Sequence, residues 1–466
     1  MNARPTHPLL ALAAIGLGAS IAPLDFSVNV AFPAITAAFA LPLPDIRWVV
    51  ISYVVTYASL MLAFGKLGDT VGHRAVFRAG LLVSVLAFTA CALASGYATL
   101  LAARALQGVA TAMVLSCAPA LLVAAYADAQ RTHALSRYAM TAAVAGILGP
   151  LVGGTAIALM GWQGVFWFRL PVALLALALL TCVPTASAAS AEKLPRPRAA
   201  AFFLQVTGLS LLLLAPALLA TALPLAWPVA CALAGALLVW LLARHEQGQS
   251  SGSPLLPAAA LRNPVLRDIN LASVVVNLVS FAIPLLVPYY LVRTAGYSVG
   301  VMGLLLAAAS AGVLVGALFA PRVAHGAGRG KAAGWGAGLI LLAQGLIGAW
   351  PASPVLALLL PGLLLHGVGV GLFQVAYADI VMSGLGAAHR GVAGSLTVLT
   401  RTTGVIVSAV VLSATWQALE AHYLAAGLTA PAAFHAAFRG TFWASGGAGL
   451  LMLAALAWHR NARRQA

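Results

Sequence analysis

Charged residues are scarce in this sequence, and acidic residues are the scarcest of them. Only 7% of the 466 residues are charged, with nine Asp and Glu against 25 Lys and Arg, whereas a soluble domain carries about 25% charged residues. Hydrophobic residues make up 62% of the chain, and the mean hydropathy is +1.00. Because a soluble fold could not bury that much apolar surface, the composition predicts an all-α integral membrane protein in contact with the lipid bilayer.

The sequence also lacks the residue clusters that support several other functions. Its four cysteines stand singly inside apolar runs, so they indicate neither a disulfide nor a zinc site. The net charge is +16, but the basic residues are scattered and no nucleic-acid surface is indicated. The chain has no P-loop, no GxGxxG that opens a helix, no metal-spaced cluster and no nucleophile elbow. We therefore expect no enzyme activity, cofactor, metal or nucleic-acid partner.

Apolar runs recur from one end of the chain to the other. A bilayer core of about 30 Å requires about 20 helical residues, and this length predicts fourteen spans. The N-terminal run continues without a convincing cleavage site, so we interpret it as an uncleaved first span. The expected spans are 9–34, 47–65, 76–95, 98–124, 137–159, 164–184, 202–222, 226–243, 268–292, 299–320, 332–350, 354–383, 391–415 and 437–458.

The distribution of Lys and Arg supports this assignment independently, because these residues gather in cytoplasmic loops. With both termini inside, 19 of the 25 lie in inner segments. Three lie at the outer side, and Arg104, Arg169 and Arg401 lie within spans. The alternation predicts that both termini are cytoplasmic.

Two long inner loops, at 185–201 and 244–267, suggest how the chain is divided. They predict an N-terminal six-helix half (1–190), an inserted helical hairpin with its linkers (191–267) and a C-terminal six-helix half (268–466). The loop GKLGDTVGHR (65–74) has a weak echo in PRVAHGAGR (321–329), which favours repeated halves.

The loop at 65–74 combines tight-turn glycines with charge. Gly65 and Gly72 let the backbones approach and turn, and Asp69 is expected against a helix N-terminus. Arg74 supplies positive charge at the cytoplasmic side. The loop is therefore a candidate conformational latch, and an ordinary positive loop is the alternative.

Asp25 is the strongest single functional candidate, because an ionisable group inside a span is costly and usually functional. Arg104 on the fourth span lies at a similar depth below the outer face. A pair of these residues can alternate between a salt bridge and a protonated carboxyl group, which predicts a proton-coupling site. The alternative is a static pair that fixes helix packing.

Several segments, in the same order along nearly the whole chain, resemble the major facilitator superfamily, and within it the fourteen-spanner drug:proton antiporters. They are LDFSVNVAFP (24–33), RWVVISY (47–53), GKLGDTVGHR (65–74), LLAARALQG (100–108), GILGPLVGG (146–154), GVGVGLFQ (367–374) and HRGVAGSLTVLTRTTG (389–404). One departure is Arg169, where the family usually has asparagine. Arg169 is expected either to snorkel to the outer interface or to add positive charge to a cavity mouth.

This resemblance implies a major-facilitator-type fold of two six-helix halves plus two inserted helices in a bacterial cytoplasmic membrane. It implies a secondary transporter that exports small amphipathic molecules or drugs in exchange for protons by alternating access. Proton-coupled uptake by the same fold is the alternative. A monomer is expected, because the fold can work as one.

The fifth span matches the antiporter-type motif of this family. Its glycines make one face smooth and Pro150 adds a kink, so close contact with a neighbouring span is expected. In the family this contact is thought to seal one side during exchange. The motif residues are Gly146, Gly149, Pro150, Gly153 and Gly154.

Further polar residues within spans are candidates for a substrate cavity, although such residues more often link helices by hydrogen bonds. His366 is interpreted either as a proton or substrate contact or as a satisfied buried histidine. Arg401 is expected to pair with Asp379 or a helix end, or to contact an anionic substrate group. The candidates are Asn29, Tyr53, Tyr57, Gln107, Asn277, Tyr289, His366, Gln374 and Arg401.

Overall fold

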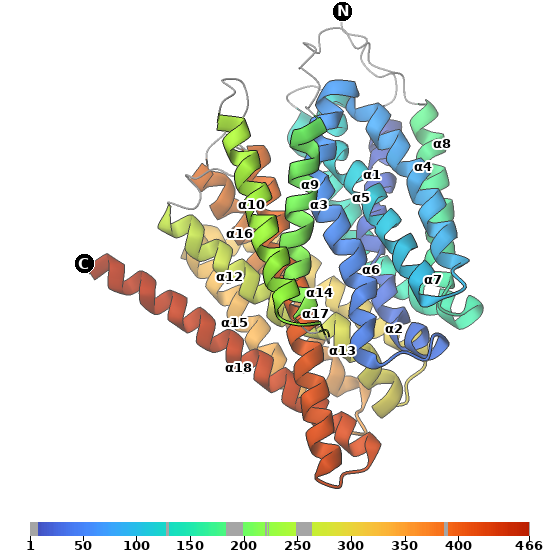
Figure 1. Ribbon diagram of the computed structural model, residues 1–466, viewed down its shortest axis with the longest axis vertical. Coiled ribbons are helices and arrows are strands. Elements are labelled where there is room, and N and C mark those ends of the chain that lie inside the picture. The colour runs from blue at the N-terminus through green and yellow to red at the C-terminus, as the bar shows by residue number, and fades with distance from the viewer. Residues whose placement is uncertain are drawn as a thin grey trace, which may run out of the picture. The chain divides into compact units, whose positions relative to one another are not determined.

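A computed structural model describes residues 8–126, 130–182, 199–219, 221, 223–247, 263–385 and 390–465. Within these ranges all regular structure is helical (Figure 1). Eleven helices are long and apolar enough to cross a membrane, or twelve when α1 and α2 are counted as one broken span. Most of the two long inner loops expected at 185–201 and 244–267 lies outside the described residues.

The count of fourteen spans is not confirmed, although each expected segment coincides with a helix or a broken helix. The apolar stretch Ala226–Leu242 of α10 is shorter than 18 residues and is not counted among the eleven. Nor is α15 (Arg329–Gly348) counted, since two cations and several glycines lower its hydropathy. The all-helical membrane architecture itself agrees with the prediction.

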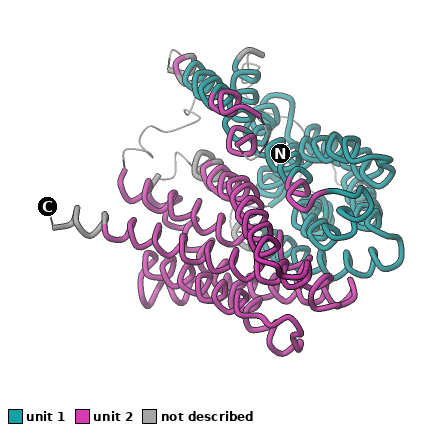
Figure 2. The backbone as a smooth tube through the Cα atoms, turned by 60° about the horizontal axis from the view of Figure 1, so that its bottom comes forward, with its two compact units in different colours: residues 1–41, 48–214, 230–242 teal, residues 42–47, 215–229, 243–466 magenta. Residues whose placement is uncertain are grey.

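The helices form two compact units (Figure 2). The first comprises residues 1–41, 48–214 and 230–242, and the second comprises residues 42–47, 215–229 and 243–466. The segment expected as an inserted hairpin therefore contributes residues to both units. The division at 190 and 267 stays a prediction.

The first unit is built around α1 and α4. α1 packs against α5, α6 and α8, and α4 packs against α5 and α8. Phe77, Leu81, Phe88 and Leu122 belong to the buried core between these helices. The helices are α1 (Pro8–Leu24), α2 (Ser27–Ala38), α3 (Arg47–Val71), α4 (His73–Ala92), α5 (Tyr97–Ala125), α6 (Arg131–Met160), α7 (Gly164–Trp167), α8 (Arg169–Cys182), α9 (Ala199–Leu218) and α10 (Ala226–Gln247).

The first expected span is broken, which the sequence analysis did not predict. α1 and α2 meet at an angle of 41° around Asp25 and Phe26. Pro23 lies in the last turn of α1 and has no backbone N–H to donate. At the break, the Asp25 amide donates to the Ala22 carbonyl oxygen at 3.1 Å, and the Phe26 amide donates to the Pro23 carbonyl oxygen at 3.2 Å. These shorter-range bonds satisfy the backbone while the chain changes direction.

The second unit has α16 at its centre, with α14 and α15 packed on it. α12 packs on α17, and α18 packs on both α15 and α17. The elements are η1 (Leu43–Ile46), α12 (Pro264–Ser280), α13 (Ala282–Tyr289), the π-helix η3 (Tyr290–Thr294), α14 (Val299–Ala327), α15 (Arg329–Gly348), α16 (Leu356–Leu385), α17 (Arg390–Ala425) and α18 (Ala430–Gln465).

Glycines allow α14 to approach α16 very closely. A Cβ atom on Gly312 of α14 would lie 2.6 Å from the Leu364 carbonyl oxygen of α16, and one on Gly371 of α16 would lie 2.7 Å from the Ala317 amide nitrogen of α14. Any larger residue at these positions would force the helices apart. This contact is the small-residue packing typical of membrane helices.

Corresponding turns occur in the two loops whose sequences echo each other. Gly72 separates α3 from α4 with φ +98°, and Gly328 separates α14 from α15 with φ +91°. A side chain is strained at such angles, so glycine is the residue that permits an abrupt change of helix direction.

Candidate functional site

Asp25 lies at the break between α1 and α2, where 11% of its side chain is exposed. Arg104 of α5 binds it in bidentate geometry. The Nη1 atom of Arg104 donates to Oδ1 at 2.7 Å, and Nη2 donates to Oδ2 at 2.9 Å. Paired bonds of this kind are stronger and more directional than a single contact. The two residues whose depths agreed in the sequence are therefore in direct contact.

Arg169 is a second cation on the same carboxylate. It is the first residue of α8, its Nη1 atom lies 2.5 Å from Asp25 Oδ1, and its Nε atom donates to the Val165 carbonyl oxygen at 2.7 Å. The side chain is fully buried, so the expected snorkelling to the outer interface is wrong. The buried carboxylate holds it inside instead. An arginine within an apolar run requires an anionic partner, and that argument would have pointed to Asp25.

Gln107 and the backbone of α3 complete the polar contacts around Arg104. Gln107 donates from Nε2 to Asp25 Oδ1 at 2.8 Å and accepts from Arg104 Nη1 at 2.7 Å. Arg104 Nε donates to the Val49 carbonyl oxygen at 3.1 Å. Tyr53 places its ring 4.3 Å from the Arg104 guanidinium carbon. We call Asp25, Arg104, Gln107 and Arg169 the buried ion cluster.

The buried ion cluster contains one carboxylate and two guanidinium groups, so it carries an excess of one positive charge. Phe88 and Phe166 lie 4.8 and 5.0 Å from the Arg169 guanidinium carbon, which makes these surroundings largely apolar. Arg169 Nη2 has no hydrogen-bond partner among the described residues. Protonation of Asp25 would remove the only negative charge and release both arginines, so the cluster can respond chemically to a single proton.

The antiporter-type motif of α6 packs directly against the break that carries Asp25. A Cβ atom on Gly149 would lie 3.0 Å from the Leu24 carbonyl oxygen, and one on Gly153 would lie 2.6 Å from Ser27 Cβ. Leu24 and Ser27 flank the break on either side. Gly146 faces the ring of Phe26 at 3.9 Å; Gly154 is buried, and Pro150 lies inside α6. The smooth face of α6 therefore holds the backbone around the carboxylate.

The candidate latch is compact but partly exposed. Asp69, in the last turn of α3, lies 3.2 Å from His73 Nε2 at the start of α4. Arg74 donates from Nη2 to the Leu180 carbonyl oxygen of α8 at 2.6 Å. Gly65 lies 3.9 Å, measured from an added Cβ atom, from Ser116 of α5. Residues 65–71 belong to α3, so of the expected turn glycines Gly72 forms the turn and Gly65 does not; the segment lies beside α5 and α8 of its unit.

The remaining candidates of the first unit differ in their surroundings. Tyr53 is buried beside Arg104, and the partly buried Tyr57 lies 5.3 Å from it between ring centroids. Asn29 is partly buried on α2, one turn beyond Asp25. The structure brings Tyr53, Tyr57 and Gln107 together at the buried ion cluster.

A polar network in the second unit includes Asn277, the only member chosen from the sequence. Asn277 Nδ2 donates to the Ser273 carbonyl oxygen at 2.7 Å, and Ser273 Oγ lies 3.3 Å from Thr400 Oγ1. The Tyr377 hydroxyl lies 2.8 Å from Thr400 Oγ1 and donates to Asn270 Oδ1 at 2.7 Å. This network joins α12, α16 and α17, and the individual residues are too common to reveal it in sequence.

For Arg401 and for His366 in the second unit, one of the expected alternatives is wrong. Asp379 pairs with Arg329 of α15 at 2.8 Å, and not with Arg401, whose side chain is exposed. His366 is buried, but its Nδ1 atom has no hydrogen-bond partner among the described residues, so it is not a satisfied histidine. Tyr289 is fully buried with Arg293 over its ring, and Gln374 is partly buried. Within the described ranges, no group of three or more His, Cys, Asp or Glu is placed to hold a metal ion.

The helical architecture and the order of the motifs define a class of membrane transporter. The model of the Major Facilitator Superfamily matches residues 9–409, and this chain belongs to that family. Its members are transporters of small molecules, not enzymes.

Among the similar proteins is the multidrug resistance protein Stp of Mycobacterium tuberculosis, which is 31% identical over 87% of this chain and 75% of its own length. The cephamycin export protein CmcT of Amycolatopsis lactamdurans is 29% identical over 81% of this chain and 78% of its own. The methylenomycin A resistance protein of Streptomyces coelicolor is 31% identical over 61% of this chain, and the match spans only 60% of that relative.

Solved structures show the same fold. A POT family transporter in complex with a thioalcohol-conjugated peptide superposes with a TM-score of 0.71 at 10% identity, over 97% of this chain and 95% of its own. A bacterial homologue of the lysosomal transporter Spinster gives a TM-score of 0.66 at 16% identity, over 97% and 96%. At these identities the likeness concerns the fold alone.

The charge balance of the buried ion cluster predicts how its variants fold. Asp25→Asn leaves two guanidinium groups buried without an anion, and we expect a loss of about 3–5 kcal/mol in the free energy of unfolding. The double variant Asp25→Asn with Arg169→Asn restores the excess of one positive charge and should be more stable than Asp25→Asn alone. Thermal unfolding of the purified proteins in detergent measures both.

The matched control is Asp379→Asn, which breaks the exposed pair with Arg329. A surface pair contributes about 0–1 kcal/mol, so this variant should resemble the wild type. If the effects of Asp25→Asn and Arg169→Asn were simply additive, the charge balance would not govern the stability of the cluster.

The glycine face of α6 predicts that the effect of a Gly→Ala substitution on stability depends on its position along the helix. Gly153→Ala should destabilise the protein by about 1–3 kcal/mol, because its Cβ atom overlaps Ser27 and forces α6 away from the break. Gly146→Ala adds the same methyl group at ordinary contact distance from the Phe26 ring and should be tolerated. Equal melting temperatures for the two variants would contradict the close approach.

Proposed function

We propose that this protein is a proton-coupled exporter that moves small amphipathic molecules or drugs out of the cell by alternating access. The observation that carries the proposal is the buried ion cluster, in which one carboxylate is held by two guanidinium groups at a broken span. Ionisable groups inside a membrane are rare and are mostly found on proton or substrate pathways.

In the proposed cycle, Asp25 takes up a proton from the outer side and gives it up to the inner side. Protonation removes the charge that holds Arg104 and Arg169, so the contacts of α5 and α8 with the break weaken together. Loss of the proton restores both ion pairs. A two-state element biased in this way can link proton movement to the exposure of a substrate site.

The packing of α6 supports an antiport cycle. Gly149 and Gly153 bring α6 against Leu24 and Ser27, the residues on either side of the break. A change at Asp25 would therefore reach α6 directly through backbone contact. We assign to this contact the sealing of one side during exchange.

Charge and the names of relatives support a substrate class. The buried ion cluster has an excess of one positive charge, and acids are few in the whole chain, with nine Asp and Glu. This balance favours neutral, zwitterionic or anionic substrates over multiply charged cations. Relatives are named for multidrug resistance, methylenomycin A resistance and cephamycin export, so we propose antibiotic-like compounds as the first candidates.

Proton-coupled uptake is the second candidate function, because the same cluster can serve a symporter. Deleting the gene separates the two directions. Loss of an exporter raises the internal accumulation of a labelled candidate compound, whereas loss of an importer lowers it.

We also propose fourteen spans in the bacterial cytoplasmic membrane, with both termini cytoplasmic and the monomer as the working unit. Reporter tags fused after successive helices should place the loops at Gly72 and Gly328 on the same cytoplasmic side as the termini. The excess of Lys and Arg in the proposed inner segments supports this orientation. Termini on opposite sides would contradict the span count.

Transport in reconstituted vesicles tests the coupling role of Asp25. A compound to which overexpression confers resistance should be moved against its gradient when a pH gradient is imposed. The double variant Asp25→Asn with Arg169→Asn should lose at least about tenfold in gradient-driven transport, because it keeps the charge of the site but has no carboxyl group to bind a proton.

Downhill exchange of the same compound by the same vesicles is the control for a folded, inserted protein. Full gradient-driven transport by the double variant would show that Asp25 is not the coupling group. Normal gradient-driven transport by Asp379→Asn is expected, since that exposed carboxylate lies outside the buried ion cluster.

A further inference from the structure

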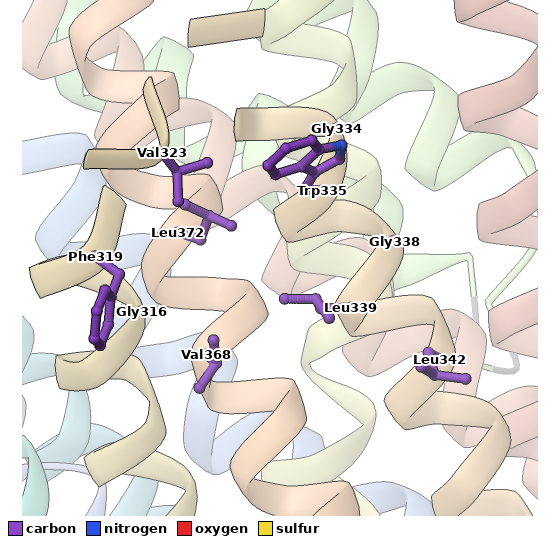
Figure 3. A pocket seen from close by; sticks show the side chains of 10 residues that line it. All are labelled: Gly316, Phe319, Val323, Gly334, Trp335, Gly338, Leu339, Leu342, Val368 and Leu372. Atoms are coloured by element: carbon purple, nitrogen blue, oxygen red, sulfur yellow. The ribbon is translucent and has the colours of Figure 1, made fainter. Parts of the chain in front are cut away.

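An apolar groove of about 560 Å³ runs between α14 and α15 over the surface of α16 (Figure 3). Its walls include Phe319 of α14 and Trp335, Leu339 and Leu342 of α15. Val368 and Leu372 of α16 lie at its base. The volume lies within the range of about 300–1,000 Å³ that is typical of small-molecule sites. The polar candidate residues of the transport site are not part of it.

The groove exists because α14 and α15 both pack closely on α16 and contact each other much less. Gly312 and Gly316 bring α14 onto α16, and Gly336 brings α15 onto α16, where its added Cβ atom would lie 2.7 Å from the Phe373 amide nitrogen. Gly334 and Gly338, which line the groove on α15, have open space where a Cβ atom would be added. The groove is therefore open space left by glycines on α15 that no neighbouring side chain fills.

Two cations lie at one end of the groove, one on each of its walls. Arg322 is exposed on α14, with its guanidinium carbon 5.8 Å from the ring centroid of Phe319. Lys331 is exposed on α15, one helical turn, or about 6 Å, before Trp335. Neither forms a salt bridge within the part of the chain that the structure describes. Arg329, between them in sequence, is already paired with Asp379 and Ser383.

We propose that this groove binds one anionic phospholipid, with an acyl chain along α16 and the phosphate between Arg322 and Lys331. The apolar walls match a hydrocarbon chain, and the paired cations at one end match a phosphate joined to that chain. Basic pockets between membrane helices on the cytoplasmic side bind anionic head groups in this manner. Trp335 lies next to Lys331, as expected for an aromatic residue at the membrane interface.

The occupant is a lipid and not a partner helix, because charge complementarity is confined to one end of the groove. Of Arg322, Arg329 and Lys331, Arg329 is the one that pairs with a carboxylate, Asp379, within the described residues, and the other two leave two positive charges for the ligand. One phosphodiester with its attached chain satisfies both the charge and the apolar surface. This site lies in the second unit and requires nothing of the proposed proton coupling.

Native mass spectrometry of the full-length protein, titrated with phosphatidylglycerol or phosphatidylcholine in detergent micelles, tests the proposal. The wild type should retain phosphatidylglycerol in preference to phosphatidylcholine. The double variant Arg322→Gln with Lys331→Gln should lower phosphatidylglycerol affinity about 30-fold, which corresponds to about fivefold for each of the two basic residues. The control double variant Arg78→Gln with Arg137→Gln removes two exposed cations from the first unit and should bind like the wild type.

A larger side chain in the groove tests the binding of the acyl chain separately from the binding of the phosphate. Gly338→Leu should abolish retention of the lipid, because the new side chain occupies the open space beside Leu339 and Leu342. Gly345→Leu is its matched control: it makes the same substitution on α15, also has open space, and lies outside the groove. Melting temperatures near that of the wild type show that all four variants are folded.

Three results would overturn the proposal. One is equal retention of the two lipids by the wild type. Another is unchanged phosphatidylglycerol affinity in the Arg322→Gln, Lys331→Gln variant. The third is a self-associated complex that Gly338→Leu dissociates, which would assign the groove to a second copy of the chain.

Discussion

The carboxylate of Asp25 is the contact on which the packing of the first unit depends. It accepts hydrogen bonds from Arg104 of α5, from Gln107 of α5 and from Arg169 of α8, while its own backbone lies at the break between α1 and α2. Two buried guanidinium groups without this carboxylate would each require water that the membrane interior does not supply. Three separate helical elements are therefore tied to one negative charge.

The cost of burying a charge in the membrane explains which residues of the site can be predicted from the sequence. An acid and a base within apolar runs are conspicuous, and their matching depths led directly to Asp25 and Arg104. For Arg169, the sequence favours either snorkelling to the outer interface or a positive charge at a cavity mouth, and it does not predict the contact with Asp25. The burial of Arg169 depends on the ion pair with Asp25, which lies 144 residues earlier in the chain, and no local pattern predicts that contact.

In the fold, too, some features are predictable from the sequence and others are not. Long apolar segments and the motif order were sufficient to predict an all-helical major-facilitator architecture, because the bilayer imposes both length and hydrogen bonding on each span. The break at Asp25 was missed, since proline within a membrane helix is common and does not by itself mark a bend. The pair of Arg329 with Asp379 was also missed, since an exposed pair between residues 50 positions apart leaves no spacing to recognise.

The break in the first span has a mechanical consequence. The carboxylate of Asp25 projects from the bend itself, whereas its cationic partners belong to two different helices, α5 and α8. Because Asp25 lies at the bend, a change in the angle between α1 and α2 would reorient its carboxylate relative to both arginines. Bend angle and ion pairing are therefore coupled, so a motion that straightened the first span would also change the ion pairs in the interior of its unit.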